Sequence, residues 1–329
     1  MAVIDIVIPT YRGMVTEALG PFVAMIQKAN CYCRDRKSGN PAHLAWECTN
    51  GKHSIRNMPP TYNSSVIHWA RNQAIAQALY GQPKDGRPPC DYLFLMDDDM
   101  MCEPDYLLRL ASYKLDVVTG ICTIRRDPPR PNIRSWDEAN GCFHDIVEWD
   151  WDSQKLFEIG GVGAAFMLIK RGVFERLGQA YLNCELEIAE DLRKTTAGKD
   201  EILAYWAKKS ELRHTRFENA LKDGKWGEAD CWWFSFLNNI VDNQLGEAGE
   251  DMSFSWKMRY FGYKIMADPQ ILPGHLGLYG YSIRDHKDLL ERMKAEGQYR
   301  PQENCEEVAT GIIVPRLMEG GMSKGGPVA

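Results

Sequence analysis

An apolar run that ends in three consecutive aspartates constrains the fold of this chain more than any other feature. The run is Tyr92–Met96, and Asp97, Asp98 and Asp99 follow it directly. A short, uninterrupted apolar segment of this kind predicts a strand that is buried on both faces of an open α/β sheet. In such sheets ligands bind beyond the carboxyl ends of the strands, where the strand order reverses. The aspartates therefore stand where a binding site is expected.

Three adjacent carboxylates repel one another, and this repulsion indicates a metal site. A like-charge pair at ~4 Å costs about 4 kcal/mol at the effective dielectric of a protein surface. A divalent cation removes this cost, and hard carboxylate oxygens suit Mg²⁺ or Mn²⁺. The alternative is a solvated acidic turn before a helix, because Glu103-Pro104-Asp105 is typical of a helix start. The run by itself leaves both interpretations open.

The size and charge of the chain limit the class of protein. Its 329 residues suffice for one large α/β domain with attachments, or for two domains. Hydrophobic residues make up 44% and charged residues 26%, values that are usual for a folded globular protein. The formal net charge of −6, without a strong basic block, argues against nucleic acid as the main partner.

The first residues and the cysteines predict a cytoplasmic protein with reduced thiols. Residues 1–5 lack the basic segment of a signal peptide, and Asp5 interrupts the apolar run. The ten cysteines are scattered along a long chain, unlike those of a small disulfide-rich domain. No apolar stretch approaches the ~20 residues that a membrane-spanning helix needs, so no transmembrane segment is expected. Whether the chain forms a homo-oligomer stays open.

Strand and helix patterns alternate along the chain, which predicts crossover units and a largely parallel sheet. Strands are predicted at residues 4–8, 92–96, 116–122, 157–159, 164–169 and 264–267, with a weaker pattern at 44–48. Helices are predicted at residues 17–29, 66–79, 106–113, 171–177, 250–261 and 286–294. A charged segment at about 181–230 has helical spacing and is interpreted as an inserted helical hairpin. The glycine-rich residues 320–329 predict a mobile tail.

Several short motifs occur in one order and give the chain a resemblance to a known family. The motifs are Pro9-Thr10-Tyr11 after the first strand, Ala70-Arg71-Asn72, Asp97-Asp98-Asp99, Gly160-Gly161-Val162-Gly163, Glu250-Asp251, and Gly274-His275-Leu276-Gly277. Each is weak singly, and their joint order is the stronger signal. Over roughly residues 3–280, the chain resembles the metal-dependent, nucleotide-sugar glycosyltransferases of the GT-A fold, especially the family-2-like branch of bacteria and phages.

The resemblance implies a fold, a domain division and an activity. The fold would be α/β, with a GT-A-like, Rossmann-type, mostly parallel sheet flanked by helices and carrying the helical insertion. Residues 1–280 would form the glycosyltransferase domain, and residues 281–329 a C-terminal helical extension and tail. The activity would be transfer of a hexose from a nucleoside diphosphate sugar to an acceptor hydroxyl on a glycan, lipid, protein or small molecule.

The resemblance also implies the metal ligands. Asp99 would be the direct ligand, and His275 would be the third ligand. Asp97 points to the same side as Asp99 if the strand continues, and it would reach either the donor ribose or the metal shell. The cofactor would be Mn²⁺ or Mg²⁺, bridging the two phosphates of the donor. Asp98 would face elsewhere, and it is either a donor contact or a loop carboxylate. A single histidine is more often structural, which is the alternative for His275.

Further residues are implied to contact the donor. Tyr11 would stack on the nucleobase beside Thr10, and Arg71 would bind the diphosphate. Arg125 would line the donor site, and Gly161 would let the backbone approach the sugar. Ordinary alternatives stand beside these roles, namely packing for the tyrosine, a helix surface for the arginine and a tight turn for the glycine.

The pair Glu250-Asp251 is implied to serve the acceptor. Asp251 would take the proton of the attacking hydroxyl, and Glu250 would orient it or bind the acceptor. Acidic residues are also common at helix starts, because they complement the helix dipole. The aromatic cluster at Trp232 and Trp233 would lie near the acceptor, with core packing as the alternative.

The chain departs from the family pattern in one region. The family has an acidic residue after its second strand that contacts the nucleobase, and residues 47–51 offer no clean match, so the base is open. The same region holds Cys31, Cys33 and Cys48, for which a structural zinc is a further hypothesis. An aspartate base favours inversion at the anomeric carbon, although relatives with a histidine-completed metal site include retaining enzymes.

Two other functions compete with glycosyl transfer. One is a non-catalytic module that binds glycans or assembles with partners on a transferase scaffold. Retention of both the aspartate cluster and Glu250-Asp251 argues against it. The other is a sugar-phosphate nucleotidyltransferase, a class that carries a glycine-rich, basic phosphate loop after its first strand. Pro9-Thr10-Tyr11-Arg12-Gly13 does not supply such a loop.

Overall fold

A central sheet of seven strands organises the described part of the chain. The computed structural model describes residues 2–9, 16–31, 53–57, 67–80, 89–125, 128–139, 142–178, 233–234, 237–241, 244–276 and 280–297, together with positions 208, 212, 215, 216 and 219. The strand order in the sheet is β10-β15-β5-β12-β3-β1-β2. The strands are β1 (Ala2–Val7), β2 (His53–Asn57), β3 (Tyr92–Met96), β5 (Val117–Thr119), β10 (Phe157–Ile159), β12 (Phe166–Lys170) and β15 (Ile265–Ala267).

The sheet is mixed, and this corrects the prediction of a mostly parallel one. The pairs β1–β2, β1–β3 and β5–β15 are parallel, whereas β3–β12, β5–β12 and β10–β15 are antiparallel. Strand β12 enters the sheet directly after a short ribbon, without a crossover helix. Strands β10 and β12 run opposite to the other five strands of the sheet, a direction that the pattern of apolar residues does not encode. The α/β class itself is confirmed.

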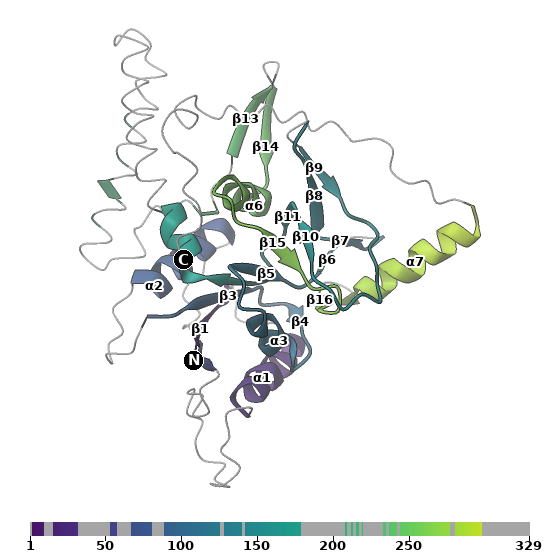
Figure 1. Ribbon diagram of the computed structural model, residues 1–329, viewed down its shortest axis with the longest axis horizontal. Helices are drawn as coiled ribbons and strands as arrows, with labels where there is room; N and C mark the ends of the chain where they lie inside the picture. Colours follow the sequence, from purple (N-terminus) through teal and green to yellow (C-terminus); the bar gives the residue numbers. More distant parts are fainter. Residues whose placement is uncertain are drawn as a thin grey trace.

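Helices cover both faces of the sheet and complete two hydrophobic cores. Leu93 and Leu95 of β3 face the first core, which includes residues of α2, α6 and the helical segment 171–178. Phe94 and Met96 face the second core, with residues of α1 and α3. Figure 1 shows α1 and α3 on one side of the sheet and α6 on the other. The helices are α1 (Thr16–Cys31), α2 (Ile67–Tyr80), α3 (Tyr106–Ser112), α6 (Glu250–Tyr260) and α7 (Ile283–Ala295).

The alternation along β3 explains why its sequence is uninterruptedly apolar. Successive side chains of a strand point to opposite faces, so a strand between two helical layers buries both sets. Leu93, Phe94, Leu95 and Met96 expose at most 1% of their surface. The predicted bounds of β3 and of β10 match the structure, and the predicted helices match within a few residues.

Short antiparallel ribbons lie outside the main sheet, in segments that the sequence pattern left as loops. A three-stranded sheet has the order β11-β8-β9, and a second one has the order β17-β16-β4. Two pairs, β6–β7 and β13–β14, complete the set. The strands are β4 (Met100–Met101), β6 (Thr123–Ile124), β7 (Arg130–Pro131), β8 (Ile133–Asp137), β9 (Cys142–Asp145), β11 (Gly161–Val162), β13 (Leu237–Val241), β14 (Gln244–Ala248), β16 (Gly274–Leu276) and β17 (Gly280–Tyr281).

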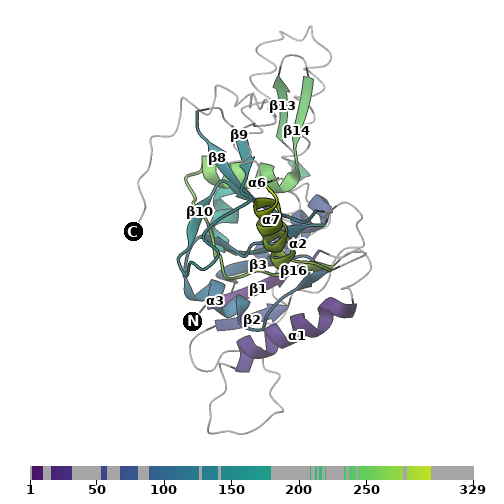
Figure 2. The same cartoon turned by 90° about the vertical axis from the view of Figure 1, so that its right-hand side faces the viewer.

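The last described helix, α7, is anchored at its start and through one buried histidine. Ser282 and Asp285 form a reciprocal capping box, which satisfies backbone donors at the first turn. His286 is buried, and its Nδ1 and Nε2 lie 2.9 and 2.7 Å from the carbonyl oxygens of Pro129 and Val147. The helix begins before the predicted residue 286, and Figure 2 shows it beside the short ribbons.

Several predicted features lie outside the described residues. They are the strand at 44–48, the tail at 320–329 and almost all of the helical hairpin at 181–230. The division at residue 280 stays a prediction. None of the described helices has the length and apolar character that crossing a bilayer requires.

Replacing Gly160 with alanine is expected to destabilise the protein by about 1–3 kcal/mol, because overpacking forces the backbone apart. A Cβ at Gly160 would collide with the backbone nitrogen of Trp136 and lie 2.5 Å from the carbonyl carbon of Ser135. Gly172, in the helical segment 171–178, serves as the control, because no atom lies within 4 Å of the place that an added methyl group would take. Gly172→Ala should leave the free energy of unfolding unchanged or raise it by up to about 1 kcal/mol. Urea denaturation measures both, and equal stability of the two variants would contradict the packing described.

Candidate functional site

A ribbon that follows β3 brings His275 to the aspartate cluster. Residues Asp97–Asp99 leave the carboxyl end of β3, and β4 begins at the next residue. Strand β16 pairs with β4, so that His275 lies opposite Met100. The backbone N–H of Leu276 donates to the carbonyl oxygen of Asp99 at 2.9 Å. The pairing explains why residues so far apart in the sequence share one site.

Asp97, Asp99 and His275 form a group that could hold a metal ion. One ligand atom from each residue lies within 4.8 Å of the others. His275 Nε2 is 3.0 Å from Asp99 Oδ1, and these side chains expose only 11% and 9% of their surface. The structure thus brings together the three residues that were predicted as ligands.

The hydrogen bonding of His275 leaves two acceptor atoms facing each other. Nδ1 lies 2.9 Å from the carbonyl oxygen of Thr123, which can only accept, so Nδ1 carries a hydrogen. In the neutral ring Nε2 then presents a lone pair to Asp99 Oδ1. Both atoms are buried and have no other hydrogen-bond partner among the described residues. Two buried acceptors at 3.0 Å require a proton or a cation between them.

The pKa shifts agree with a proton in that position when no cation is bound. Burial opposes the charge on His275, but the hydrogen bonds to Asp99 and to the Thr123 carbonyl, together with the charge of Asp99, outweigh burial and raise the pKa of the imidazole. Burial likewise opposes the charge on Asp99, yet His275 and Arg125 lower the pKa of this carboxyl overall. Both shifts favour the charged forms of the two groups, an imidazolium and a carboxylate.

The donor set fits a hard or borderline divalent ion. In an octahedron with ligands at about 2.0–2.1 Å, neighbouring ligand atoms lie about 3.0 Å apart. The separation of His275 Nε2 from Asp99 Oδ1 has this value. Carboxylates suit Mg²⁺ and Mn²⁺, and an imidazole is a common third ligand to transition metals.

A buried arginine connects this group to the start of α6. Arg71 Nη2 lies 2.9 Å from Asp97 Oδ1, and Nη1 lies 2.6 Å from Asp251 Oδ1 and 3.4 Å from Glu250 Oε1. The side chain of Arg71 exposes 4% of its surface. Burial opposes its charge, but Asp251, Asp97 and Glu250 outweigh burial and raise the pKa of Arg71.

The partners of Arg71 differ from the predicted diphosphate contact. Both terminal nitrogens already hold carboxylates, and only Nε lacks a hydrogen-bond partner within the described chain. Sequence reasoning missed this because carboxylates on β3 and α6 meet α2 only in the folded chain. Arg71 is thus the counter-ion that ties Asp97 to Glu250 and Asp251.

Asp251 combines a raised pKa with partial solvent access. It lies in the first turn of α6, after Gly249 at the N-cap position. Although 24% of its side chain is exposed, desolvation by the surrounding protein raises the pKa of its carboxyl to about 6, against the lowering effect of Arg71. A carboxylate with such a pKa accepts protons more strongly than an ordinary aspartate.

Arg125 supplies a second, more accessible positive charge. Its Nη1 lies 2.5 Å from Asp99 Oδ2, and 52% of the side chain is exposed. This placement beside the metal-ligand candidates agrees with a position at the predicted donor site. The mobile stem of an exposed arginine lets it exchange one anion for another.

Gly161 has a packing reason for its lack of a side chain. A Cβ there would lie 3.0 Å from Phe143 Cε1, 3.1 Å from Met252 Sδ and 3.2 Å from Ser255 Cβ. The next residue, Val162, donates its backbone N–H to Ser255 Oγ at 3.2 Å. The glycine therefore lets β11 pack closely on α6, and contact with a donor sugar stays a prediction.

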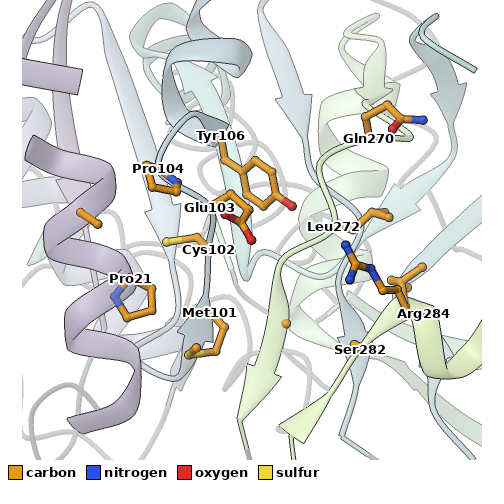
Figure 3. A pocket seen from close by; sticks show the side chains of 13 residues that line it. Pro21, Met101, Cys102, Glu103, Pro104, Tyr106, Gln270, Leu272, Ser282 and Arg284 are labelled. Carbon is orange, nitrogen blue, oxygen red and sulfur yellow. The ribbon is translucent and has the colours of Figure 1, made fainter. Parts of the chain in front are cut away.

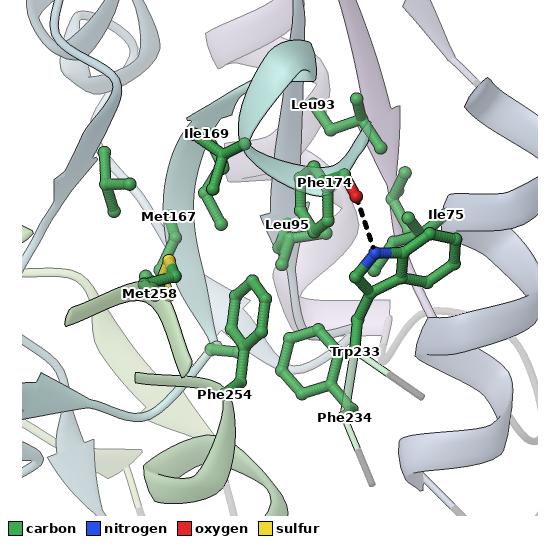
Figure 4. Close-up of a cluster of buried hydrophobic side chains, with 14 of the residues drawn as sticks. Ile75, Leu93, Leu95, Met167, Ile169, Phe174, Trp233, Phe234, Phe254 and Met258 are labelled. Atoms are coloured by element: carbon green, nitrogen blue, oxygen red, sulfur yellow. Dashed lines mark hydrogen bonds between the residues drawn. The ribbon is translucent and has the colours of Figure 1, made fainter. Parts of the chain in front are cut away.

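Trp233 belongs to the core, which corrects the acceptor contact predicted for this residue. Trp233 is fully buried, and its indole N–H donates to the carbonyl oxygen of Phe174 at 2.9 Å (Figure 4). A ring enclosed in this way offers no face to a sugar. Phe234 beside it bonds through its backbone N–H to Asn72 Oδ1, and its ring centroid lies 5.3 Å from Arg71 Cζ. This support for Arg71 had no signal in the sequence.

The remaining predicted residues are partly outside the described chain. Asp98 is half-buried and does not belong to the three-residue group. Thr10, Tyr11, Trp232, Cys33 and Cys48 lie outside the described residues, as does the side chain of Cys31. Thr123, whose carbonyl orients His275, was not predicted, because a backbone acceptor leaves no trace in a sequence.

A cavity of about 570 Å³ lies next to the β4–β16 ribbon but is separate from the metal-ligand group. Figure 3 shows Pro21 of α1, Met101 of β4, Tyr106 of α3 and Arg284 of α7 around it. None of the predicted site residues lines this cavity. The candidate site is therefore defined by its side-chain cluster.

Comparisons with known proteins add little to this geometry. No protein-family model matches the chain, and no curated protein matches its sequence. Among solved structures, the chain is similar to the one titled "Crystal Structure of A197 from STIV", with 14% sequence identity and a TM-score of 0.37. The similarity covers 84% of this chain and 86% of that chain. A TM-score of this size supports no argument about fold or function.

Proposed function

We propose that the chain is a metal-dependent glycosyltransferase that moves a sugar from a nucleoside diphosphate sugar to an acceptor hydroxyl. One observation carries the proposal. Residues from α2, the end of β3, α6 and β16 form a connected cluster, which joins His275, Asp99, Asp97, Arg71 and Asp251. A metal-ligand group beside a carboxyl with a raised pKa is what transfer from a diphosphate donor requires.

Asp97, Asp99 and His275 are the proposed ligands of Mn²⁺ or Mg²⁺. The bound ion would neutralise the charge of the departing nucleoside diphosphate. Thr123 holds the imidazole through its carbonyl oxygen, so that Nε2 faces the ligand position. Arg125, half-exposed beside Asp99, is placed to bind a phosphate oxygen once that carboxylate turns to the ion.

Asp251 is the proposed base. Its Oδ1 accepts from Arg71, the backbone of Ala164 also bonds to the carboxylate, and a lone pair remains to accept the proton of the acceptor hydroxyl. The hydroxyl oxygen then bonds to the anomeric carbon as the bond from that carbon to the diphosphate oxygen breaks. This single displacement inverts the anomeric configuration. Arg71 is a positioning residue, since it keeps the base at a fixed place relative to Asp97.

The GT-A assignment of the sheet is part of the same proposal. In support, the acidic cluster follows a central strand, and both faces of the sheet carry helices. A screen of nucleoside diphosphate sugars with Mn²⁺, monitored by slow donor hydrolysis, tests the activity. Release of nucleoside diphosphate from one donor is expected, and no release from any of them would count against a transferase.

Loss of a metal ligand is expected to lower the affinity for Mn²⁺ at least about tenfold, because each ligand contributes directly to the bound state. The variants are Asp99→Asn and His275→Ala. Asp288→Asn, at an exposed position of α7, makes the same chemical change away from the site. Isothermal titration calorimetry measures the affinities, and unchanged binding in Asp99→Asn would refute the proposed ligand set.

Replacing Asp251 with asparagine is expected to lower the transfer rate by about 10²–10⁴-fold while leaving donor and Mn²⁺ binding intact, because a general base contributes about this factor. The asparagine oxygen can still accept from Arg71, so the fold should persist. Asp116→Asn, in an exposed ion pair with Lys170, is the matched control. Rates like those of the unaltered protein in the Asp251 variant would exclude this residue as the base.

The transfer rate is expected to rise with pH through about 6, where the carboxyl of Asp251 loses its proton. Below this pH the protonated acid cannot accept the hydroxyl proton, so kcat/KM should fall about tenfold per pH unit. Initial rates at saturating Mn²⁺, measured from about pH 4.5 to about pH 8, give the profile. A flat profile across pH 6 would contradict the role of Asp251.

A further inference from the structure

A second group of metal-ligating side chains lies on the β8–β9 ribbon. In this antiparallel pair Asp137 is opposite Cys142, and Ser135 is opposite His144. Because side chains alternate along a strand, Asp137, Cys142 and His144 lie on one face of the ribbon. Trp136 and Phe143 lie on the other face, with their ring centroids 4.8 Å apart.

The donor atoms of this group converge on one point. Cys142 Sγ lies 3.3 Å from His144 Nε2, and this nitrogen lies 3.5 Å from Asp137 Oδ2. All three atoms are within 4.8 Å of one another. For a tetrahedral zinc with ligands at about 2.0–2.3 Å, the ligand atoms lie about 3.4–3.6 Å apart. The two shortest observed separations are close to these values.

The same geometry argues against a nucleophilic Cys-His-Asp triad. In a triad the nucleophile and the orienting carboxylate contact opposite nitrogens of the histidine. Here the thiol and the carboxylate both face Nε2. Convergence of three donors on one position is the arrangement of a cation site.

We propose that Asp137, Cys142 and His144 bind a zinc ion, with water at the fourth position. A thiolate and an imidazole favour Zn²⁺ over Mg²⁺ and Mn²⁺, which the carboxylates of the first group suit better. Asp137 and His144 expose 29% and 28% of their side chains, so an ion can enter and a water ligand can remain. The chain would then hold two metals of different chemical character.

Zinc at this position would join the two strands of the ribbon close to the proposed active site. On the opposite face of the ribbon, Phe143 packs against Gly161, so that a methyl group on Gly161 would lie 3.0 Å from the Phe143 ring. The backbone N–H of Gly160 donates to the carbonyl oxygen of Arg134 in β8 at 2.6 Å. Figure 2 shows the ribbon beside α6, the helix that carries Asp251. The ion would therefore stabilise the β8–β9 ribbon where it lies beside α6.

The test uses Co²⁺ as a spectroscopic probe on the full chain after treatment with a chelator. Cobalt takes the place of zinc and gives a thiolate-to-metal charge-transfer absorption only where a cysteine is a ligand. A band that saturates and is abolished by Zn²⁺ is expected. Cys142→Ser should remove the band, and His144→Ala and Asp137→Asn should weaken Co²⁺ binding at least about tenfold. Asp152→Asn, at an exposed position, should bind as the unaltered chain does.

Two further measurements keep the result decisive. Circular dichroism and Mn²⁺ affinity of Cys142→Ser should match those of the unaltered chain, which shows that the fold and the Asp97 group persist. Persistence of the charge-transfer band in Cys142→Ser, or its loss in Cys33→Ser instead, would overturn the proposal. Because no step depends on glycosyl transfer, failure here is distinct from failure of the proposed function.

Discussion

The buried guanidinium of Arg71 is the interaction on which the candidate site depends. It joins α2 to the carboxyl end of β3 and to the first turn of α6 through Asp97, Asp251 and Glu250. A buried charge is tolerated only when it is paired, and the three carboxylates pair the buried guanidinium while it reduces the repulsion among them. Without it the carboxylates would repel one another at close range. The distance between the metal-ligand candidates and the proposed base is therefore set by one side chain.

Short ribbons complete what the central sheet begins. The pairing of β4 with β16 places His275 beside Asp99. The β11-β8-β9 sheet places a second group of metal-ligating side chains near α6. Neither ribbon contributes a strand to the main sheet. Metal ions bound at these two places would link side chains from neighbouring strands. The group at the end of β3 and the Asp137 group are thus both proposed metal sites built from neighbouring strands, and their ligand types favour different ions.

Features that depend on residues close together in the sequence were predicted, and features that depend on contacts between distant segments were not. Strand β3 was predicted with its observed bounds, because burial on both faces leaves an uninterrupted apolar signature. The grouping of Asp97 and Asp99 followed from the strand period, and that of His275 from the family resemblance. The direction of β12 and the partners of Arg71 were not predicted, and for Trp233 the structure favours core packing, the alternative to the acceptor contact. Each depends on which distant segment packs beside it, and local patterns do not contain that information.

The sequence by itself therefore determined the α/β class, the positions of six of the seven strands of the main sheet and of the helices that cover it, and the kinds of chemical group available. Local periodicity and side-chain chemistry suffice for these, since they act within one turn or one strand. Only the tertiary structure decided that the sheet is mixed, that Arg71 binds carboxylates, and that Asp137, Cys142 and His144 meet on one ribbon face. The physical reason is that charge pairing and metal-ligand geometry depend on distances of a few ångströms between segments that only chain packing brings together.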